Sequence, residues 1–270
     1  MHAALQQRAT AGCAFDQPAA DPVDPARCAR SGGGEQAGRA ESGRQSVPSK
    51  HRRRTLPSAR RRLWLFDLDD TLHRATPVIF GRMNRAMTDY VMRHLDLPEN
   101  AANELRQAYW RRYGATLLGL MRRHGVDPRH FLLETHQFPD LAAVIDYDHQ
   151  VRRMLKHLPG RKVLLSNAPD HYVHAVLRAM RVRGHLHAVE TIESMRYVPK
   201  PARSSLARVL KRQQSAGCRV VMVEDNLANL KTAKRLGLTT VWVSQAAGRP
   251  AYVDVKVKNI LHLSKHSRLR

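Results

Sequence analysis

LWLFDLDDT, residues 63–71, is the stretch that decides how this chain folds. The run from Leu63 to Phe66 is apolar, and the carboxylates of Asp67 and Asp69 follow it one residue apart. An apolar run of this length that ends in charge is typical of a buried strand. In an open α/β sheet, ligands bind at the carboxyl ends of such strands. Two carboxylates this close repel each other unless a cation neutralises them or one carries a proton, and both conditions suit phosphoryl chemistry.

The composition is strongly basic. The chain has 270 residues, with 46 Lys and Arg against 23 Asp and Glu, which gives a formal net charge of +23. The length permits one large domain or a domain with an inserted subdomain. The charge favours contact with polyanions and encounter with phosphorylated small molecules. It specifies no substrate, because biased composition alone gives the same excess, and it does not define an oligomeric state.

The cysteines and the apolar segments indicate a compartment. Cys13, Cys28 and Cys218 are too few and too scattered for a disulfide framework or a zinc cage, and they fit a reducing compartment. No apolar segment approaches the ~18 residues that a membrane span needs. The N-terminus lacks the apolar core of a secretory signal. We therefore expect a cytoplasmic protein without a membrane partner.

Residues 1–61 differ from the rest of the chain. They are rich in Ala, Gly, Ser, Pro and Arg, end in the basic run His51 to Arg54, and show no helical or strand periodicity. This composition predicts a disordered basic extension. Three interpretations stay open: a solvated tail without function, an arm for nucleic acid or targeting, and translation that begins upstream of the real start. The interspersed acidic residues argue against a transit peptide.

From Leu63 onward the pattern is globular. After the first strand, turn signals divide a helical region from about Thr76 to His157. None of its pieces shows strand-like alternation, so we expect an all-helical insertion at residues 76–157 within an α/β core made of residues 62–75 and 158–270. The clearest pieces of the insertion are Pro77–Leu95, Asn100–Tyr113 and Ala115–His124.

Strands alternating with helices return after Gly160. We expect Asn167 to cap a helix that begins near Pro169, and a helix from Asn226 to Leu236 that ends at Gly237. The expected strands are Lys162–Leu165, Val220–Val223, Thr239–Val243 and Tyr252–Val257.

Polar groups follow three of these strands and occupy one loop between them. Because the carboxyl ends of parallel strands meet at one edge of a sheet, we expect these groups to converge there. They are Asp67, Asp69 and Thr71; Ser166 and Asn167; Lys200, which lies between two prolines; and Glu224 and Asp225.

Such a set can hydrolyse a phosphate ester. Asp67 is placed to attack phosphorus and form an aspartyl-phosphate. Asp69 could protonate the leaving alcohol and later deprotonate the attacking water. Mg²⁺ would bridge Asp67 and Asp225. Ser166 and a helix N-terminus would bind a phosphate oxygen, and Lys200 would offset the charge of the nucleophile and the phosphoryl group.

The order of these motifs resembles that of the haloacid dehalogenase superfamily, over roughly residues 62–262. The resemblance implies a Rossmann-like core with a C1 cap formed by residues 76–157. It assigns the nucleophile to Asp67, the acid/base to Asp69, and Mg²⁺ ligation to Asp67, Asp225 and the backbone carbonyl of Asp69. The substrate-binding residues that it implies are Thr71, Ser166, Asn167 and Lys200.

Within that superfamily the chain looks most like bacterial pyrimidine 5′-nucleotidase-type hydrolases, on residues 66–72, 113–117 and 223–230. This resemblance implies a phosphomonoesterase acting on a nucleoside monophosphate. Asp69 distinguishes the phosphatases from the dehalogenases, which replace it. The segment Ala202–Leu206 departs from the common pattern after the lysine.

Two alternatives stay open. The first is the same chemistry on another small phosphate, such as a sugar phosphate or phosphoglycolate. The second, which is not favoured, is a nucleic-acid-binding protein without catalysis on a phosphatase-like scaffold, motivated by the net charge of +23.

Overall fold

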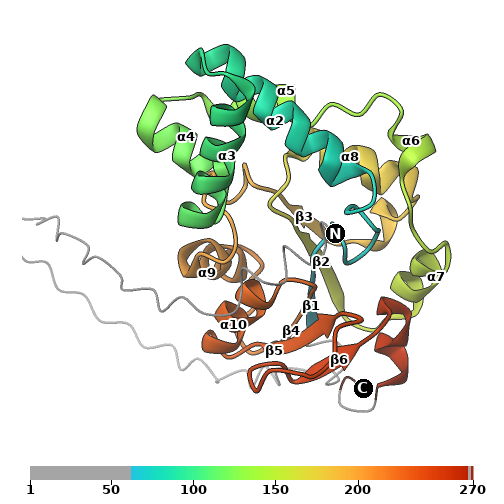
Figure 1. The fold of residues 1–270 in the computed structure, drawn as a ribbon. Coiled ribbons are helices and arrows are strands. Elements are labelled where there is room, and N and C mark those ends of the chain that lie inside the picture. The colour runs from blue at the N-terminus through green and yellow to red at the C-terminus, as the bar shows by residue number, and fades with distance from the viewer. Residues whose placement is uncertain (1–61, 267–268, 270) are drawn as a thin grey trace, which may run out of the picture. The chain divides into compact units, whose positions relative to one another are not determined.

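The structure is a computed structural model, and it describes residues 62–266 and residue 269 (Figure 1). The basic extension expected at residues 1–61 lies outside the described residues. No helix in the described part of the chain is long and apolar enough to cross a membrane.

A parallel sheet forms the centre of the described residues. Its strand order is β3-β2-β1-β4-β5-β6, and every adjacent pair is parallel. The first strand, β1, therefore lies between β2 and β4, which confirms the expected α/β, Rossmann-like class. The strands are β1 Arg62–Phe66, β2 Arg161–Leu165, β3 Ala188–Glu190, β4 Arg219–Glu224, β5 Thr239–Val243 and β6 Val255–Val257.

The side chains of β1 explain why helices cover both faces of this sheet. Successive side chains of a strand point to opposite faces. Trp64 and Phe66 belong to one apolar cluster, together with residues of α8 (Asp170–Ala179). Leu63 and Leu65 belong to the other, together with residues of α9 (Arg203–Arg212) and α10 (Leu227–Arg235). A run that is buried on both faces reads as continuously apolar, as this one does.

The long segment between β1 and β2 is helical, as expected. In Figure 1, α2 to α5 gather at the top of the view, and α6 and α7 lead back toward the sheet. The division into a core and a cap at residues 76–157 stays a prediction. The helices are α2 Ile79–Leu95, α3 Glu99–Tyr113, α4 Thr116–His124, α5 Pro128–Thr135, α6 Leu141–Val144 and α7 Gln150–His157.

Some expectations about local structure were wrong or incomplete. Asn167 does not cap α8: the N-cap position is Pro169, which makes no side-chain cap, and the N–H of Asp170 donates to Glu193 instead. The last strand is shorter than expected, beginning at Val255. The edge strand β3 and helix α9 were not anticipated. The connections also contain the short 3₁₀ helices Arg183–His185 and Ile260–Lys265.

Candidate functional site

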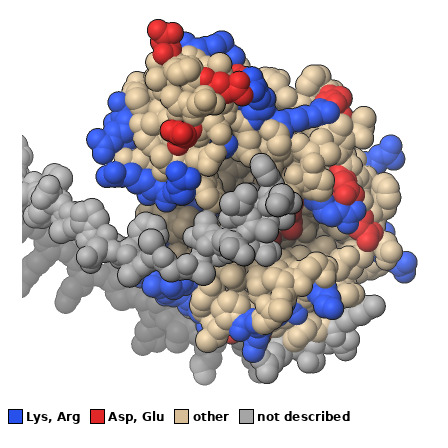
Figure 2. Space-filling view, viewed as in Figure 1, with Lys and Arg blue, Asp and Glu red and all other residues tan. Residues whose placement is uncertain are grey.

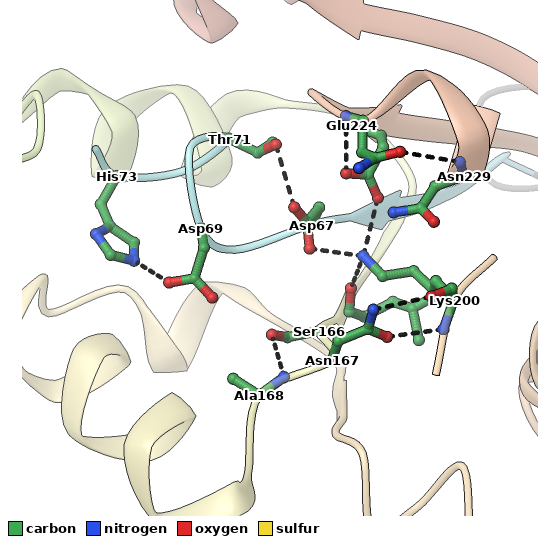
Figure 3. A network of polar contacts seen from close by, with 12 residues as sticks. Asp67, Asp69, Thr71, His73, Ser166, Asn167, Ala168, Lys200, Glu224 and Asn229 are labelled. Carbon is green, nitrogen blue, oxygen red and sulfur yellow. Dashed lines mark hydrogen bonds and ion pairs between the residues drawn. The ribbon is translucent and has the colours of Figure 1, made fainter. Parts of the chain in front are cut away.

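Three adjacent strands bring their polar ends to one edge of the sheet. Asp67 follows β1, Ser166 follows β2, and Glu224 is the last residue of β4. Since β1 pairs with both β2 and β4, these ends are neighbours. Figure 3 shows the side chains of Asp67, Lys200 and Glu224 turned toward one another, with Asn167 beneath Lys200.

Lys200 occupies the centre of this edge. Its Nζ lies 2.6 Å from Asp67 Oδ1, 2.9 Å from Glu224 Oε2 and 2.9 Å from the carbonyl oxygen of Leu165. The side chain is buried. Burial alone would lower the pKa of Lys200, but the two carboxylates outweigh it and raise the pKa above its usual value. The lysine therefore remains charged and joins the first and fourth strands.

Asn167 fixes the loop that carries this lysine. Its side-chain Nδ2 donates to the carbonyl oxygen of Lys200 at 3.0 Å, and its Oδ1 accepts from the backbone N–H of Lys200 at 2.8 Å. A paired contact of this kind fixes both the position and the direction of the loop. The amide is thus used for holding Lys200 rather than for capping a helix.

Carboxylates outnumber the cations at this edge. Oxygens of Asp67, Glu224 and Asp225 lie within 4.8 Å of one another. Burial, followed by the charge of Glu224, raises the pKa values of Asp67 and Asp225 well above their usual range. Burial also acts against the charged form of Glu224, but Lys200 outweighs it and lowers that pKa. Three carboxyl groups facing one lysine can all be ionised only when a further cation neutralises them, and we refer to these four residues as the lysine cluster.

Asp69 lies in a separate group. Its Oδ1 accepts a hydrogen bond from the hydroxyl of Tyr172 at 2.7 Å and lies 2.9 Å from Nε2 of His73. Burial acts to raise the pKa of Asp69, but the hydrogen bonds of His73 and Tyr172 outweigh it and lower the pKa. Sequence reasoning missed Tyr172, because nothing in its local pattern distinguishes it from an apolar-face residue of α8.

Two rings from the segment after α5 pack on Tyr172. The ring centroid of His136 lies 6.0 Å from that of Tyr172, and that of Phe138 lies 5.5 Å away. Burial lowers the pKa of His136 to about 4. We refer to Asp69, His73, His136, Phe138 and Tyr172 as the tyrosine cluster.

The remaining predicted site residues lie nearby. The hydroxyl of Thr71 is 3.5 Å from Asp67 Oδ2. The Oγ of Ser166 accepts from the backbone N–H of Ala168 at 3.0 Å. Asp70 serves the turn: it has a φ of 58°, and its Oδ1 accepts from the backbone N–H groups of the residues five and six positions on, at 2.8 and 2.9 Å. The sequence-predicted residues are therefore brought together at one edge.

A second group of ligand-type side chains in the described residues lies on α2 and α5, at His94, His130 and Glu134. Glu134 is already paired with Arg93 at 2.6 Å and with His130 at 2.8 Å. Its charge is balanced, unlike that of the lysine cluster, and both of these histidines are exposed.

Comparison with known proteins agrees with this geometry. Residues 62–237 match the family model of the haloacid dehalogenase-like hydrolases. The yeast (Saccharomyces cerevisiae, strain ATCC 204508 / S288c) protein named Phosphate metabolism protein 8 is 22% identical over 198 residues, which cover 66% of this chain and 60% of that protein. The chain thus spans 60% of the length of this curated relative.

Two solved structures share the fold. A HAD phosphatase from Thermococcus onnurineus superposes with a TM-score of 0.54 at 18% identity, over 76% of this chain and 96% of the other. A 2-haloacid dehalogenase from Pseudomonas syringae pv. Tomato DC3000 gives a TM-score of 0.50 at 18% identity, over the same shares of each chain. The family match over residues 62–237, on a sheet whose edge gathers the four motifs, shows that this chain belongs to the haloacid dehalogenase-like hydrolases.

Proposed function

We propose that the chain is a cytoplasmic, Mg²⁺-dependent phosphomonoesterase that acts through an aspartyl-phosphate on Asp67. The observation that carries the proposal is the lysine cluster, in which a buried aspartate contacts a buried lysine at 2.6 Å beside two further carboxylates. Two residues along the chain, Asp69 lies in different surroundings. This difference in surroundings allows one loop to supply both the nucleophile, Asp67, and the acid/base, Asp69.

In the first step, an oxygen of Asp67 attacks phosphorus. Its Oδ1 contacts Lys200, while the one hydrogen-bond partner of Oδ2 among the described residues is the hydroxyl of Thr71, at 3.5 Å. Oδ2 is therefore the oxygen we assign to the attack. The new Oδ2–P bond forms as the bond from phosphorus to the leaving alcohol breaks, and Asp69 gives its proton to that alcohol. Lys200 offsets the charge on nucleophile and phosphoryl group.

In the second step, Asp69 takes a proton from water as the water attacks phosphorus. The bond between phosphorus and Asp67 then breaks, which releases inorganic phosphate and restores the carboxylate. Because the pKa of Asp69 is lowered in the free protein, its carboxyl gains the proton for the first step when a negatively charged ester binds nearby and raises that pKa.

The donor set fits Mg²⁺. The excess negative charge of the lysine cluster and its oxygen ligands are what this cation requires. Asp67, Asp225 and the backbone carbonyl of Asp69 would hold it, and it supplies charge neutralisation for a dianionic ester. Glu224 has other partners, because it accepts from Lys200 at 2.9 Å and from the N–H of Asn226 at 3.2 Å. We assign it the role of holding the lysine.

For the substrate we propose a pyrimidine nucleoside monophosphate. The support is the resemblance of residues 66–72, 113–117 and 223–230 to pyrimidine 5′-nucleotidase-type hydrolases. The second of these stretches, between α3 and α4, is the one that bears on substrate choice. The alternative is another small phosphate, such as a sugar phosphate or phosphoglycolate.

The pairing of exposed charges in the described residues argues against nucleic-acid binding as the main function. On the face shown in Figure 2, Lys and Arg form a band along one side of the upper helices, and elsewhere they lie beside Asp and Glu. Several exposed arginines of the described residues are paired with carboxylates, among them Arg82 with Asp140 and Arg93 with Glu134. A footprint for a polyanion is a patch of one sign.

A panel of phosphate esters tests the proposal. The full chain is incubated with each ester and Mg²⁺, and release of inorganic phosphate is measured. Preference for pyrimidine nucleoside monophosphates supports the proposed substrate, and preference for a non-nucleotide ester selects the alternative. If no ester is hydrolysed and RNA binds in a salt-sensitive way without Mg²⁺, the phosphatase proposal is wrong.

A further inference from the structure

Asp69 carries both of its side-chain hydrogen bonds on one oxygen. Oδ1 meets the hydroxyl of Tyr172 at 2.7 Å and Nε2 of His73 at 2.9 Å. Among the described residues, no group forms a hydrogen bond with Oδ2. Two partners on the same oxygen fix the rotation of the carboxyl group. Asp69 therefore presents Oδ2 as its free oxygen, and the side chain remains 16% exposed.

The burial of the His73 ring indicates which of its two nitrogens carries the proton. Its side chain is fully buried, and its Nδ1 has no hydrogen-bond partner within the part of the chain that the structure describes. A buried N–H without an acceptor is rarely found in proteins. We therefore assign the proton to Nε2, which makes His73 a donor to Asp69 and leaves only a lone pair unpaired at Nδ1.

The ring of Tyr172, the second donor to Asp69, is held in place by packing. It is 1% exposed, and the rings of His136 and Phe138 pack against it. Its hydroxyl lies 2.7 Å from Oδ1 of Asp69, and because a carboxylate oxygen can only accept, the hydroxyl is the donor of this hydrogen bond. The ring packing limits the movement of that hydroxyl, which makes it a fixed point for the carboxylate.

We infer that Tyr172 is a positioning residue for the acid/base step: with His73 it holds Oδ1 of Asp69, and so turns Oδ2 toward the leaving oxygen of the ester. The inference rests on the proposed phosphomonoesterase activity. The proton moves from Oδ2 to the leaving oxygen as the P–O bond breaks, and Tyr172 keeps its own proton throughout. Orientation of this kind is a large part of what an enzyme supplies.

Two esters with different leaving groups test the inference in the Tyr172→Phe variant. Uridine 5′-monophosphate, or the alkyl phosphate that the panel ranks first, needs a proton on its leaving alcohol. The p-nitrophenolate of p-nitrophenyl phosphate leaves without one. We expect kcat/KM for the alkyl ester to fall about tenfold, mostly through kcat, and that for the aryl ester to change by less than about twofold.

Three further variants are the controls. Tyr147 donates to the carbonyl oxygen of Ala179, the last residue of the same helix α8, at 3.4 Å. Tyr147→Phe deletes a comparable hydroxyl away from the site and should leave both kcat/KM values unchanged. At the second donor, His73→Gln keeps an N–H and should lose less of the alkyl-ester activity than His73→Leu. Circular dichroism and the melting temperature check that each variant folds.

The outcomes separate the inference from the proposed function. Equal losses on both esters in Tyr172→Phe, or no loss on either, would overturn the positioning role while leaving the phosphatase intact. If Tyr172→Phe does not fold, the test becomes the alkyl-ester activity of the two His73 variants. Higher activity of His73→Gln than of His73→Leu supports the inference, and equal activity overturns it. A wild-type chain that hydrolyses neither ester refutes the proposed function itself.

Discussion

The lysine cluster and the tyrosine cluster begin from two aspartates in the same loop and differ in the groups that surround each aspartate. Asp67 shares its surroundings with two carboxylates and a lysine, and burial raises its pKa. Asp69 shares its surroundings with a histidine and a tyrosine, whose hydrogen bonds lower its pKa against the effect of burial. Environments that shift the pKa values of two neighbouring carboxyl groups in opposite directions are typical of sites where the two groups have different catalytic roles. The first cluster depends on the charges of its lysine and its carboxyl groups, and the second on oriented hydrogen bonds.

The largest effect expected is that of removing the nucleophile from the lysine cluster. Asp67→Asn should lower kcat at least ~10³-fold, because an amide cannot form the aspartyl-phosphate. The fold should persist, since asparagine still offers an oxygen to Lys200. Phosphate release and circular dichroism check both statements. Asp146→Asn, at an exposed residue paired with Arg74, is the matched control and should keep full activity. Substantial turnover in Asp67→Asn would contradict nucleophilic catalysis.

Removal of Mg²⁺ should affect the same cluster. Chelation with EDTA should lower the hydrolysis rate at least ~10²-fold, because the excess carboxylates then repel the dianionic ester, and added Mg²⁺ should restore the rate. Mg²⁺ should also raise the melting temperature of the wild-type chain and have no such effect on Asp225→Asn. Undiminished hydrolysis in EDTA would show that the lysine cluster works without the ion.

The stability of the lysine cluster should depend on its single cation. Lys200→Met leaves Asp67 and Glu224 buried without their partner, and we expect a loss of about 3–5 kcal/mol in the free energy of unfolding, measured in urea. Arg82→Met breaks the exposed pair with Asp140 and should cost only ~0.2–1 kcal/mol. Similar losses in the two variants would mean that burial does not distinguish these ion pairs.

The tyrosine cluster should make stability depend on pH through His136. Its pKa is about 4 in the folded protein against 6.5 ordinarily. In the unfolded chain this histidine therefore binds a proton below about pH 6.5, whereas in the folded chain it binds one only below about pH 4. The free energy of unfolding therefore decreases as the pH falls from about 6.5 to about 4. The loss should be on the order of 3 kcal/mol, with no further contribution at lower pH.

His136→Leu should flatten this part of the stability profile, measured by urea unfolding at a series of pH values. His157→Leu, at an exposed residue, should keep the wild-type slope. An unchanged slope in His136→Leu would show that this histidine does not titrate as its burial requires.

Much of the fold was predictable from short patterns. The apolar run before Asp67 gave β1 to within one residue, and Thr239–Val243 is a strand with the expected bounds. The helix expected at Asn226–Leu236 is α10, Leu227–Arg235, and Asn226 is its N-cap, accepting from the N–H groups of Ala228 and Asn229. Strand β3 was missed because its three residues pair only with β2 and carry too little pattern to be recognised.

The candidate site was also predictable only in part. The residues of the lysine cluster all come from motifs whose order along the chain was readable. Asn167 was assigned to the wrong task, because a residue that can cap the helix beside it can also bind a loop 33 residues away, as Asn167 does with Lys200. Tyr172 was not found, because its contact with Asp69 spans 103 residues of sequence.

The sequence by itself determined the strand polarity and the identity of the charged groups, because an apolar run that ends in carboxylates can deliver them only to the carboxyl edge of a buried parallel sheet. The tertiary structure alone decided how each carboxylate is surrounded. Burial, the approach of Lys200 and the hydroxyl of Tyr172 depend on contacts between distant segments, and those contacts determine in which direction the pKa values of Asp67 and Asp69 move.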